Sequence, residues 1–403
     1  MKLNKKKFFK YIGFIGVGAI LTYSAIENFA FGNSGNEAKH HKEVVDLKPI
    51  STTPNYAKVY NKETEILDSL VSRKAKVYDI NGSVLVAYKD QIIYQKDFGY
   101  KNPIKKEPLA PGLSFQLASV SKQFTAASIL KLYEDGKIDI DQPVKTYLPE
   151  FRFEDITVRN LLKHRSGLWN YMYLTERYWD SELAPDNLEV VDLINSFENR
   201  LNFSPGKHFN YSNTGYVVLG AIVEKVSKKS FQNYLKDSFF LPHCLDETFI
   251  DLNEKNKTAV LNGYQPYGRS YIKLPAGFHN NAFGDKGIYA SANDLFKWFK
   301  KLKNGEILSP ESVDLMFGKN ISEEDPDYGM GFRLKNEDGE RIIYHNGLWD
   351  GFRNGLEFHP DEDLVFIVLT HTQNKRKRYF QDYLIDMTKN LMSLNTTEEI
   401  AQL

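Results

Sequence analysis

Ser119 and Lys122 have residue types and a spacing that can support acyl transfer. They stand three residues apart in Ser-Val-Ser-Lys, and the apolar pattern after them predicts a helix that ends near Gly136. Ser119 would then lie at the helix N-terminus, with Lys122 one turn later on the same face. The positive end of a helix stabilises an oxyanion, and a partly desolvated lysine can take a serine proton. Taken alone, the spacing is a weak signal and is more often that of a serine that only caps the helix.

A second polar group, Tyr211-Ser212-Asn213, precedes another helical pattern. Residues two apart in an extended segment point the same way, so Tyr211 and Asn213 would face one cleft. The Tyr211 phenol can relay the proton of the nucleophile, and the Asn213 amide can donate to a substrate carbonyl. A packed tyrosine and a helix-capping asparagine would fit the same pattern.

A third group, His345-Asn346-Gly347, ends a predicted strand. Gly347 permits close approach of a backbone edge to a substrate. The N–H of Leu348 can then join that of Ser119 as an oxyanion hole. A lone histidine in a strand more often has a structural role.

Strand patterns stand at both ends of the chain and predict an α+β fold. Residues 82–88 and 92–100 indicate a hairpin, and strand signals return after about residue 333. We therefore expect one antiparallel sheet built from N- and C-terminal segments and flanked by helices. The segment between them, about 137–320, would form an inserted, mainly helical lobe.

The N-terminus has the pattern of an export segment. A basic head with five lysines precedes an apolar stretch at 11–26, so residues 1–30 are predicted to be a signal peptide or a membrane anchor. The polar residues 31–56 would form a flexible linker, and the folded domain would span 57–395. Both readings place the body of the chain on the outer side of the cytoplasmic membrane.

Composition excludes several functional classes. The 403 residues carry 52 basic and 52 acidic side chains, which argues against a nucleic-acid partner. A single cysteine, Cys244, excludes an internal disulfide and a cysteine zinc site within the chain. His40-His41 has no further ligands at zinc spacing and reads as a solvated pair in the linker. Nothing in the sequence sets the oligomeric state.

In their order and spacing, SxxK, YxN and HxG resemble the serine β-lactamase and penicillin-binding-protein superfamily, in its class C-related branch of β-lactamases, D-Ala-D-Ala carboxypeptidases and esterases. The resemblance covers about residues 66–392. Further similar stretches are DQPVKTYLPEF, LLKHRSGL at 161–168, GDKGIYASANDL at 284–295 and YGMGF at 328–332.

The resemblance implies that Ser119 is acylated while Lys122 and Tyr211 share the acid–base work. Asn213, His345, Asn346, Gly347 and Leu348 would bind substrate, with the oxyanion on the N–H groups of Ser119 and Leu348. It also implies that no metal or organic cofactor is needed. The third motif of class C β-lactamases usually carries lysine, so His345 lowers the expectation of β-lactamase activity.

These features predict an exported serine hydrolase that acts through an acyl-enzyme on an ester or a D-amino-acid amide. Its substrate would be a small molecule or a peptidoglycan or teichoic-type group. The alternatives are a membrane-tethered penicillin-binding or cell-wall-binding protein with little turnover, and a true class C β-lactamase.

Overall fold

The computed structural model describes residues 62–197, 200–250, 259–319 and 328–393. The predicted export segment 1–30, the linker 31–56 and His40-His41 lie outside these ranges. Within the described ranges, no helix combines the length and the apolar content that a membrane crossing requires.

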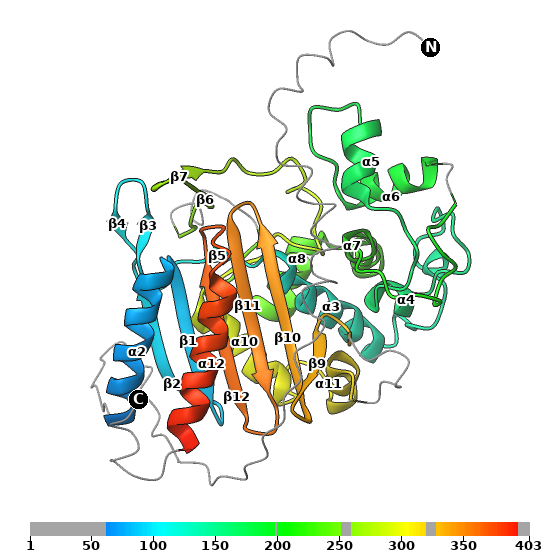
Figure 1. The fold of residues 1–403 in the computed structure, drawn as a ribbon. Helices are drawn as coiled ribbons and strands as arrows, with labels where there is room; N and C mark the ends of the chain where they lie inside the picture. Colours follow the sequence, from blue (N-terminus) through cyan, green and yellow to red (C-terminus); the bar gives the residue numbers. More distant parts are fainter. Residues whose placement is uncertain (1–61, 198–199, 251–258, 320–327, 394–403) are drawn as a thin grey trace. The chain divides into compact units, whose positions relative to one another are not determined.

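A six-stranded antiparallel sheet forms the centre of the fold, in the order β2-β1-β12-β11-β10-β9 (Figure 1). Its strands are β1 (Gly82–Tyr88), β2 (Gln91–Phe98), β9 (Arg333–Glu337), β10 (Glu340–Trp349), β11 (Phe352–His359) and β12 (Leu364–Thr370). Because β1 pairs with β12, the two ends of the chain build one sheet, which confirms the predicted fold class.

Side chains of the central strands alternate between two separate cores. Val84 and Val86 of β1 pack with helices α2 (Lys62–Tyr78) and α12 (Lys377–Ser393). Their neighbours Leu85 and Ala87 belong to the larger core on the other face. Both faces of the sheet are therefore covered, as continuous apolar strands require.

The large core lies between the sheet and the helical segment, which carries α3 (Lys122–Glu134) and α7 (Asn213–Ser227). The other helices of this half are α4 (Val158–Leu162), α5 (Tyr171–Tyr178), α6 (Asn187–Ser196), α8 (Phe231–Leu235), α10 (Ala292–Lys303) and α11 (Pro310–Phe317). Short helical turns are η2 (Ala118–Ser121), η3 (Val144–Thr146) and η4 (Lys236–Phe240). This arrangement agrees with the predicted mainly helical insertion.

Three small two-stranded sheets accompany the large one. They pair β3 (Tyr100–Asn102) with β4 (Glu107–Pro108), β5 (Phe115–Gln116) with β8 (Tyr289–Ala290), and β6 (Tyr264–Tyr267) with β7 (Ser270–Lys273). The strand-like stretch before Ser119 therefore pairs inside the helical half and not in the large sheet. This pairing matters for the site because β5 leads directly into η2.

Candidate active site

Ser119 lies in the one-turn helix η2, immediately before α3. Ala118 precedes it with φ +52°, a left-handed conformation that a residue with a Cβ adopts at a cost. The side chains of Ala118, Val120 and Ser121 are buried, whereas Ser119 is only half-buried. The strained turn therefore leaves Ser119 partly accessible to solvent, while the side chains on either side of it are buried.

Lys122 is fully buried one turn after Ser119. Its Nζ lies 3.2 Å from Ser119 Oγ, 2.8 Å from Asn213 Oδ1 and 2.8 Å from the backbone oxygen of Asp285. The amide and carbonyl oxygens only accept, so Lys122 donates to both of them. The Ser119 hydroxyl both donates and accepts, so this contact can carry a proton in either direction.

The Tyr-Ser-Asn group meets the lysine from the start of α7. Ser212 caps this helix by accepting from the N–H of Gly215, so the cap is not Asn213. Asn213 instead points its amide oxygen at Lys122, and the Tyr211 ring centroid lies 5.0 Å from the same Nζ. The structure thus brings together Ser119, Lys122, Tyr211 and Asn213 from two helix N-termini.

His164 supports the segment that carries Tyr211. It is buried with φ +56°, and its Nδ1 accepts the backbone N–H of Ser212 at 3.0 Å. Its ring lies 4.3 Å from the Tyr211 ring, centroid to centroid. Burial, and then the nearby Lys122 charge, hold the pKa of His164 well below its ordinary value, so the ring is a neutral acceptor. His164 therefore holds the turn that carries Ser212 beside the site.

The third group brings strand β10 against the turn that carries Ser119. A Cβ on Gly347 would lie 2.3 Å from the backbone oxygen of Leu117 and 3.1 Å from the Cβ of Ala118. Only glycine allows this approach of strand to turn. Leu348 follows it, opposite Arg353 in the register with β11, and is half-buried like Ser119.

His345 and Asn346 take different places. His345 is buried, with Nε2 3.1 Å from the Tyr328 hydroxyl and Nδ1 2.7 Å from the Asn346 backbone oxygen. Burial and then the Arg333 and Lys122 charges hold the pKa of His345 well below its ordinary value. Neutral His345 therefore offers the cleft no positive charge.

The Asn346 side chain lies on the other face of the sheet. Its Oδ1 is 3.0 Å from the point where a Cβ of Gly355 would stand, and Lys377 and Gln381 of α12 approach the same point. The structure therefore directs the Asn346 amide toward α12 and away from the group around Ser119.

Two neighbours of the site carried no signal in the sequence. The Arg333 guanidinium lies 4.6 Å from the Tyr211 ring centroid, measured from its carbon. Asp285 bonds Lys122 through its backbone, while its carboxylate lies 3.1 Å from the buried Lys286 ammonium. Arg333 directly follows YGMGF and Asp285 lies within GDKGIYASANDL, but their contacts with Tyr211 and Lys122 are set only by the tertiary structure.

Comparison with known proteins agrees with this geometry. A family profile described as Beta-lactamase matches residues 67–387. The chain belongs to the beta-lactamase family. This family of serine hydrolases includes penicillin-binding proteins, and the assignment confirms the resemblance drawn from the three motifs.

Three known proteins show what this beta-lactamase family chain is similar to in sequence or fold. Penicillin-binding protein 4* of Bacillus subtilis is 31% identical over 323 residues, which are 76% of this chain and 71% of the relative. The octameric penicillin-binding protein homologue from Pyrococcus abyssi superposes with a TM-score of 0.69 at 26% identity, over 80% of this chain and 76% of that one. D-amino acid amidase from Ochrobactrum anthropi, 19% identical with a TM-score of 0.70 over 82% and 99%, shares the fold.

Replacing Gly347 with alanine is expected to separate β10 from the Ser119 turn of this beta-lactamase family protein. The added Cβ would meet a backbone oxygen, which no side-chain rotation relieves. We expect kcat/KM for an ester to fall by about 100-fold or more, as for loss of one oxyanion donor. Gly136→Ala is the control, because its φ of +68° imposes strain but nothing lies within 4 Å. Equal activity of the two variants would contradict a role for this contact.

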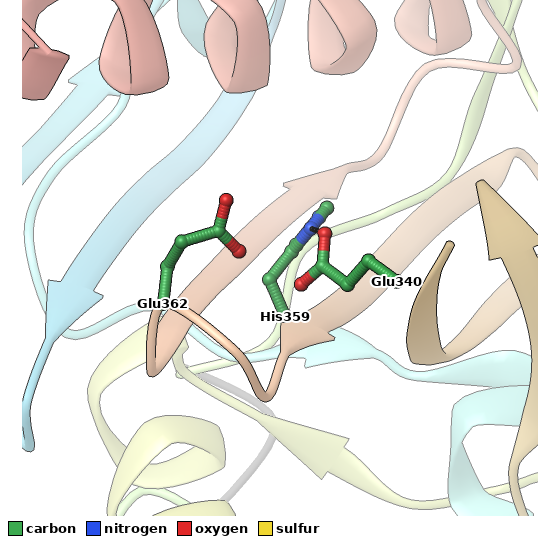
Figure 2. Close-up of side chains that lie close together, drawn as sticks. All are labelled: Glu340, His359 and Glu362. Carbon is green, nitrogen blue, oxygen red and sulfur yellow. Dashed lines mark hydrogen bonds and ion pairs between the residues drawn. The ribbon is translucent and has the colours of Figure 1, made fainter. Parts of the chain in front are cut away.

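A second polar cluster of the beta-lactamase family domain lies at the opposite end of β10. Figure 2 shows Glu340, at the start of β10, close to His359 and Glu362 near the turn from β11 to β12. The potential ligand atoms of the three residues lie within 4.8 Å of one another. The Lys389 ammonium already lies 3.0 Å from Glu340 and 2.8 Å from Glu362. Lysine therefore neutralises the carboxylates here, and we assign no metal to the cluster.

This cluster makes the stability of the beta-lactamase family domain depend on pH. Burial opposes the charge of His359, but bonds to Glu340 and Glu357 outweigh it and raise the pKa of His359. The stabilisation is complete below the unfolded pKa of about 6.5 and is lost as pH rises through the higher folded pKa. His359→Gln should therefore lower stability by about 1–3 kcal/mol at pH 5 and by less at pH 8. Thermal unfolding at both pH values measures this, with the exposed His208→Gln as control; an equal loss would contradict it.

Proposed function

We propose that this chain is an exported serine hydrolase that acts through an acyl-enzyme on an ester or a D-amino-acid amide. The observation that supports it most is the position of Lys122, whose buried Nζ lies within hydrogen-bond distance of Ser119 and is fixed by two pure acceptors. A lysine held in this way points its Nζ at the serine hydroxyl.

In the first step, Ser119 Oγ attacks the substrate carbonyl carbon and its proton passes to Lys122. This transfer requires the neutral form of the Lys122 amine. The Tyr211 ring lies beside the same Nζ, and its hydroxyl group would relay the proton to the leaving alkoxide or amine. The bond from the carbonyl carbon to that leaving group breaks as the acyl-enzyme forms.

The negative charge of the tetrahedral intermediate would rest on two backbone N–H groups, those of Ser119 and Leu348. The close packing of Gly347 on Leu117 supports this assignment, because it brings β10 beside η2. Such donors are already oriented before the reaction and need no rearrangement in the transition state. Water deprotonated by the Tyr211 and Lys122 pair would then release the acyl group.

The neutral state of His345 disfavours a dedicated β-lactamase. Its two nitrogens are both engaged, and the nearest cation above the tyrosine is Arg333. We propose that Arg333 supplies the positive charge on this side of the cleft. The names of structural neighbours, an amidase and penicillin-binding proteins, support acyl groups of the D-amino-acid type.

We further propose that residues 1–30 export the protein and that the domain works outside the cytoplasmic membrane, on peptidoglycan or teichoic-type material or on a small molecule. The basic head and apolar stretch of the sequence support this placement. No metal or organic cofactor is assigned to the reaction.

Mass spectrometry of the full chain after incubation with p-nitrophenyl esters, D-alanyl amides and esters, and penicillin tests the proposal. We expect an adduct on Ser119 that turns over with an ester or D-amino-acid amide and persists with penicillin. Nitrocefin should be hydrolysed slowly. Adducts that never turn over would favour a binding protein, fast nitrocefin hydrolysis would favour a β-lactamase, and acylation at another residue would refute the site.

A further inference from the structure

Two β-hairpins near the end of the sheet where β10 ends at Trp349 expose apolar and basic side chains together. The hairpins are β3–β4, residues 100–108, and β6–β7, residues 264–273 (Figure 1). Four large apolar side chains stand in water: Tyr100 at 38%, Ile104 at 50%, Tyr267 at 69% and Ile272 at 46% exposed. Single exposed apolar residues are common on protein surfaces, but four of them on two adjoining hairpins indicate an interaction surface.

The same hairpins carry a strong local charge. The two hairpins contain five exposed basic residues and one acidic residue, Glu107. Their formal charge is therefore +4, whereas the formal net charge of the whole chain is zero. The basic residues are Lys101, Lys105, Lys106, Arg269 and Lys273. Such a concentration of one sign attracts a polyanion or an anionic surface and repels a second copy of itself.

The two hairpins are tied to one another at their bases. His371 bonds the backbone oxygen of Asn262 through Nδ1 and that of Tyr100 through Nε2, each at 2.8 Å. Asn81 accepts the N–H of Tyr100 at 3.0 Å and donates to the Tyr271 hydroxyl at 3.3 Å. These bridges fix both hairpins to the sheet, so they act as one surface.

We propose that these hairpins dock the domain on an anionic lipid bilayer. Aromatic and aliphatic side chains flanked by lysine and arginine favour the interface between headgroups and acyl chains, where both find partners. Ile104 and Tyr267 lie at or next to the hairpin turns, so they project first. A soluble polyanion would bind the basic side chains but would leave the four apolar side chains exposed to water.

Docking places the active site close to the bilayer. Gly263, just before β6, packs on the turn that follows β10, since its Cβ would lie 1.7 Å from the backbone oxygen of Asp350. That turn directly follows Leu348 and Trp349. The surface is independent of the chemistry at Ser119, so failure of the proposed reaction would leave this proposal standing.

A fluorescent probe on the hairpin tests the proposal. The full chain with Cys244→Ser and Ser270→Cys is labelled with a polarity-sensitive dye and added to vesicles of phosphatidylcholine with or without phosphatidylglycerol. On anionic vesicles, any attachment through residues 1–30 is the same for both labels and for all variants, so differences among them report on the hairpins. Asn336→Cys is the control label, because it precedes the turn at the opposite end of the ten-residue strand β10, about 30 Å away.

We expect the Ser270 label to shift to the blue and to be quenched by lipid-borne quenchers in anionic vesicles only, while the Asn336 label stays in water. Lys105→Gln with Lys106→Gln should weaken docking about fivefold per lysine. Lys207→Gln with Lys236→Gln, exposed lysines of the helical half, should have no effect. A Ser270 label that stays unquenched in anionic vesicles, or equal quenching in neutral vesicles, would overturn the proposal.

Discussion

Ser119→Ala is expected to lower kcat/KM for a p-nitrophenyl ester by about 10⁴–10⁶-fold, the range for removal of an acylated nucleophile. The same change should abolish labelling by a fluorophosphonate or penicillin probe. Ser119 is half-buried, and its hydroxyl lies 3.2 Å from Lys122 Nζ. We therefore expect the free energy of unfolding to change by less than about 0.5 kcal/mol.

Ser121→Ala is the matched control for Ser119→Ala. It lies in the same turn, but it is buried and accepts the N–H of Ile288 at 3.3 Å. This change should cost some stability and leave probe labelling intact. Labelling that survives in Ser119→Ala and disappears in Ser121→Ala would assign the nucleophile to the other serine.

Lys122→Met is expected to lower kcat/KM by about 10²–10⁴-fold, the usual contribution of a general base. Methionine keeps the length of the side chain but can neither take the Ser119 proton nor donate to Asn213 and Asp285. Because two oxygens lose their donor, stability should also fall, by about 1–3 kcal/mol for each buried acceptor. Steady-state kinetics and thermal unfolding measure the two effects separately.

Lys122→Arg separates proton transfer from charge. Arginine keeps the positive charge but stays protonated, so it cannot accept the serine proton. We expect this variant to be as inactive as Lys122→Met, while the exposed Lys131→Met of the same helix stays fully active. Activity of Lys122→Arg within tenfold of the unmodified protein would show that the lysine acts as a charge and not as a base.

Local sequence patterns were sufficient for the sheet and for the nucleophile turn. The alternation that sends Val84 to one core and Leu85 to the other is set by residue period, which the chain itself carries. Ser119 and Lys122 are three residues apart, so any helical turn places them together. The turn at 338–339 between β9 and β10 is equally local, since both residues have positive φ.

Long-range contacts decided the rest of the site. The sequence could not show that Lys122 would donate a hydrogen bond to the backbone oxygen of Asp285, which is 163 residues away in the chain. Nor could it show that the Arg333 guanidinium would lie over the Tyr211 ring. It also left the cap of α7 open, and the structure gives that role to Ser212, which frees the Asn213 amide for Lys122. Asn346, predicted beside substrate, has its side chain on the α12 face because strand residues alternate.

By itself, the sequence determined the chemistry available to this protein: one serine with a lysine a turn away, a tyrosine and an asparagine before a second helix, and a glycine at a strand end. The tertiary structure alone decided which of these groups meet, which histidines are neutral, and where positive charge gathers. The physical reason is range. Periodicity and capping act over a few residues, whereas burial and electrostatic coupling depend on segments that only folding brings together.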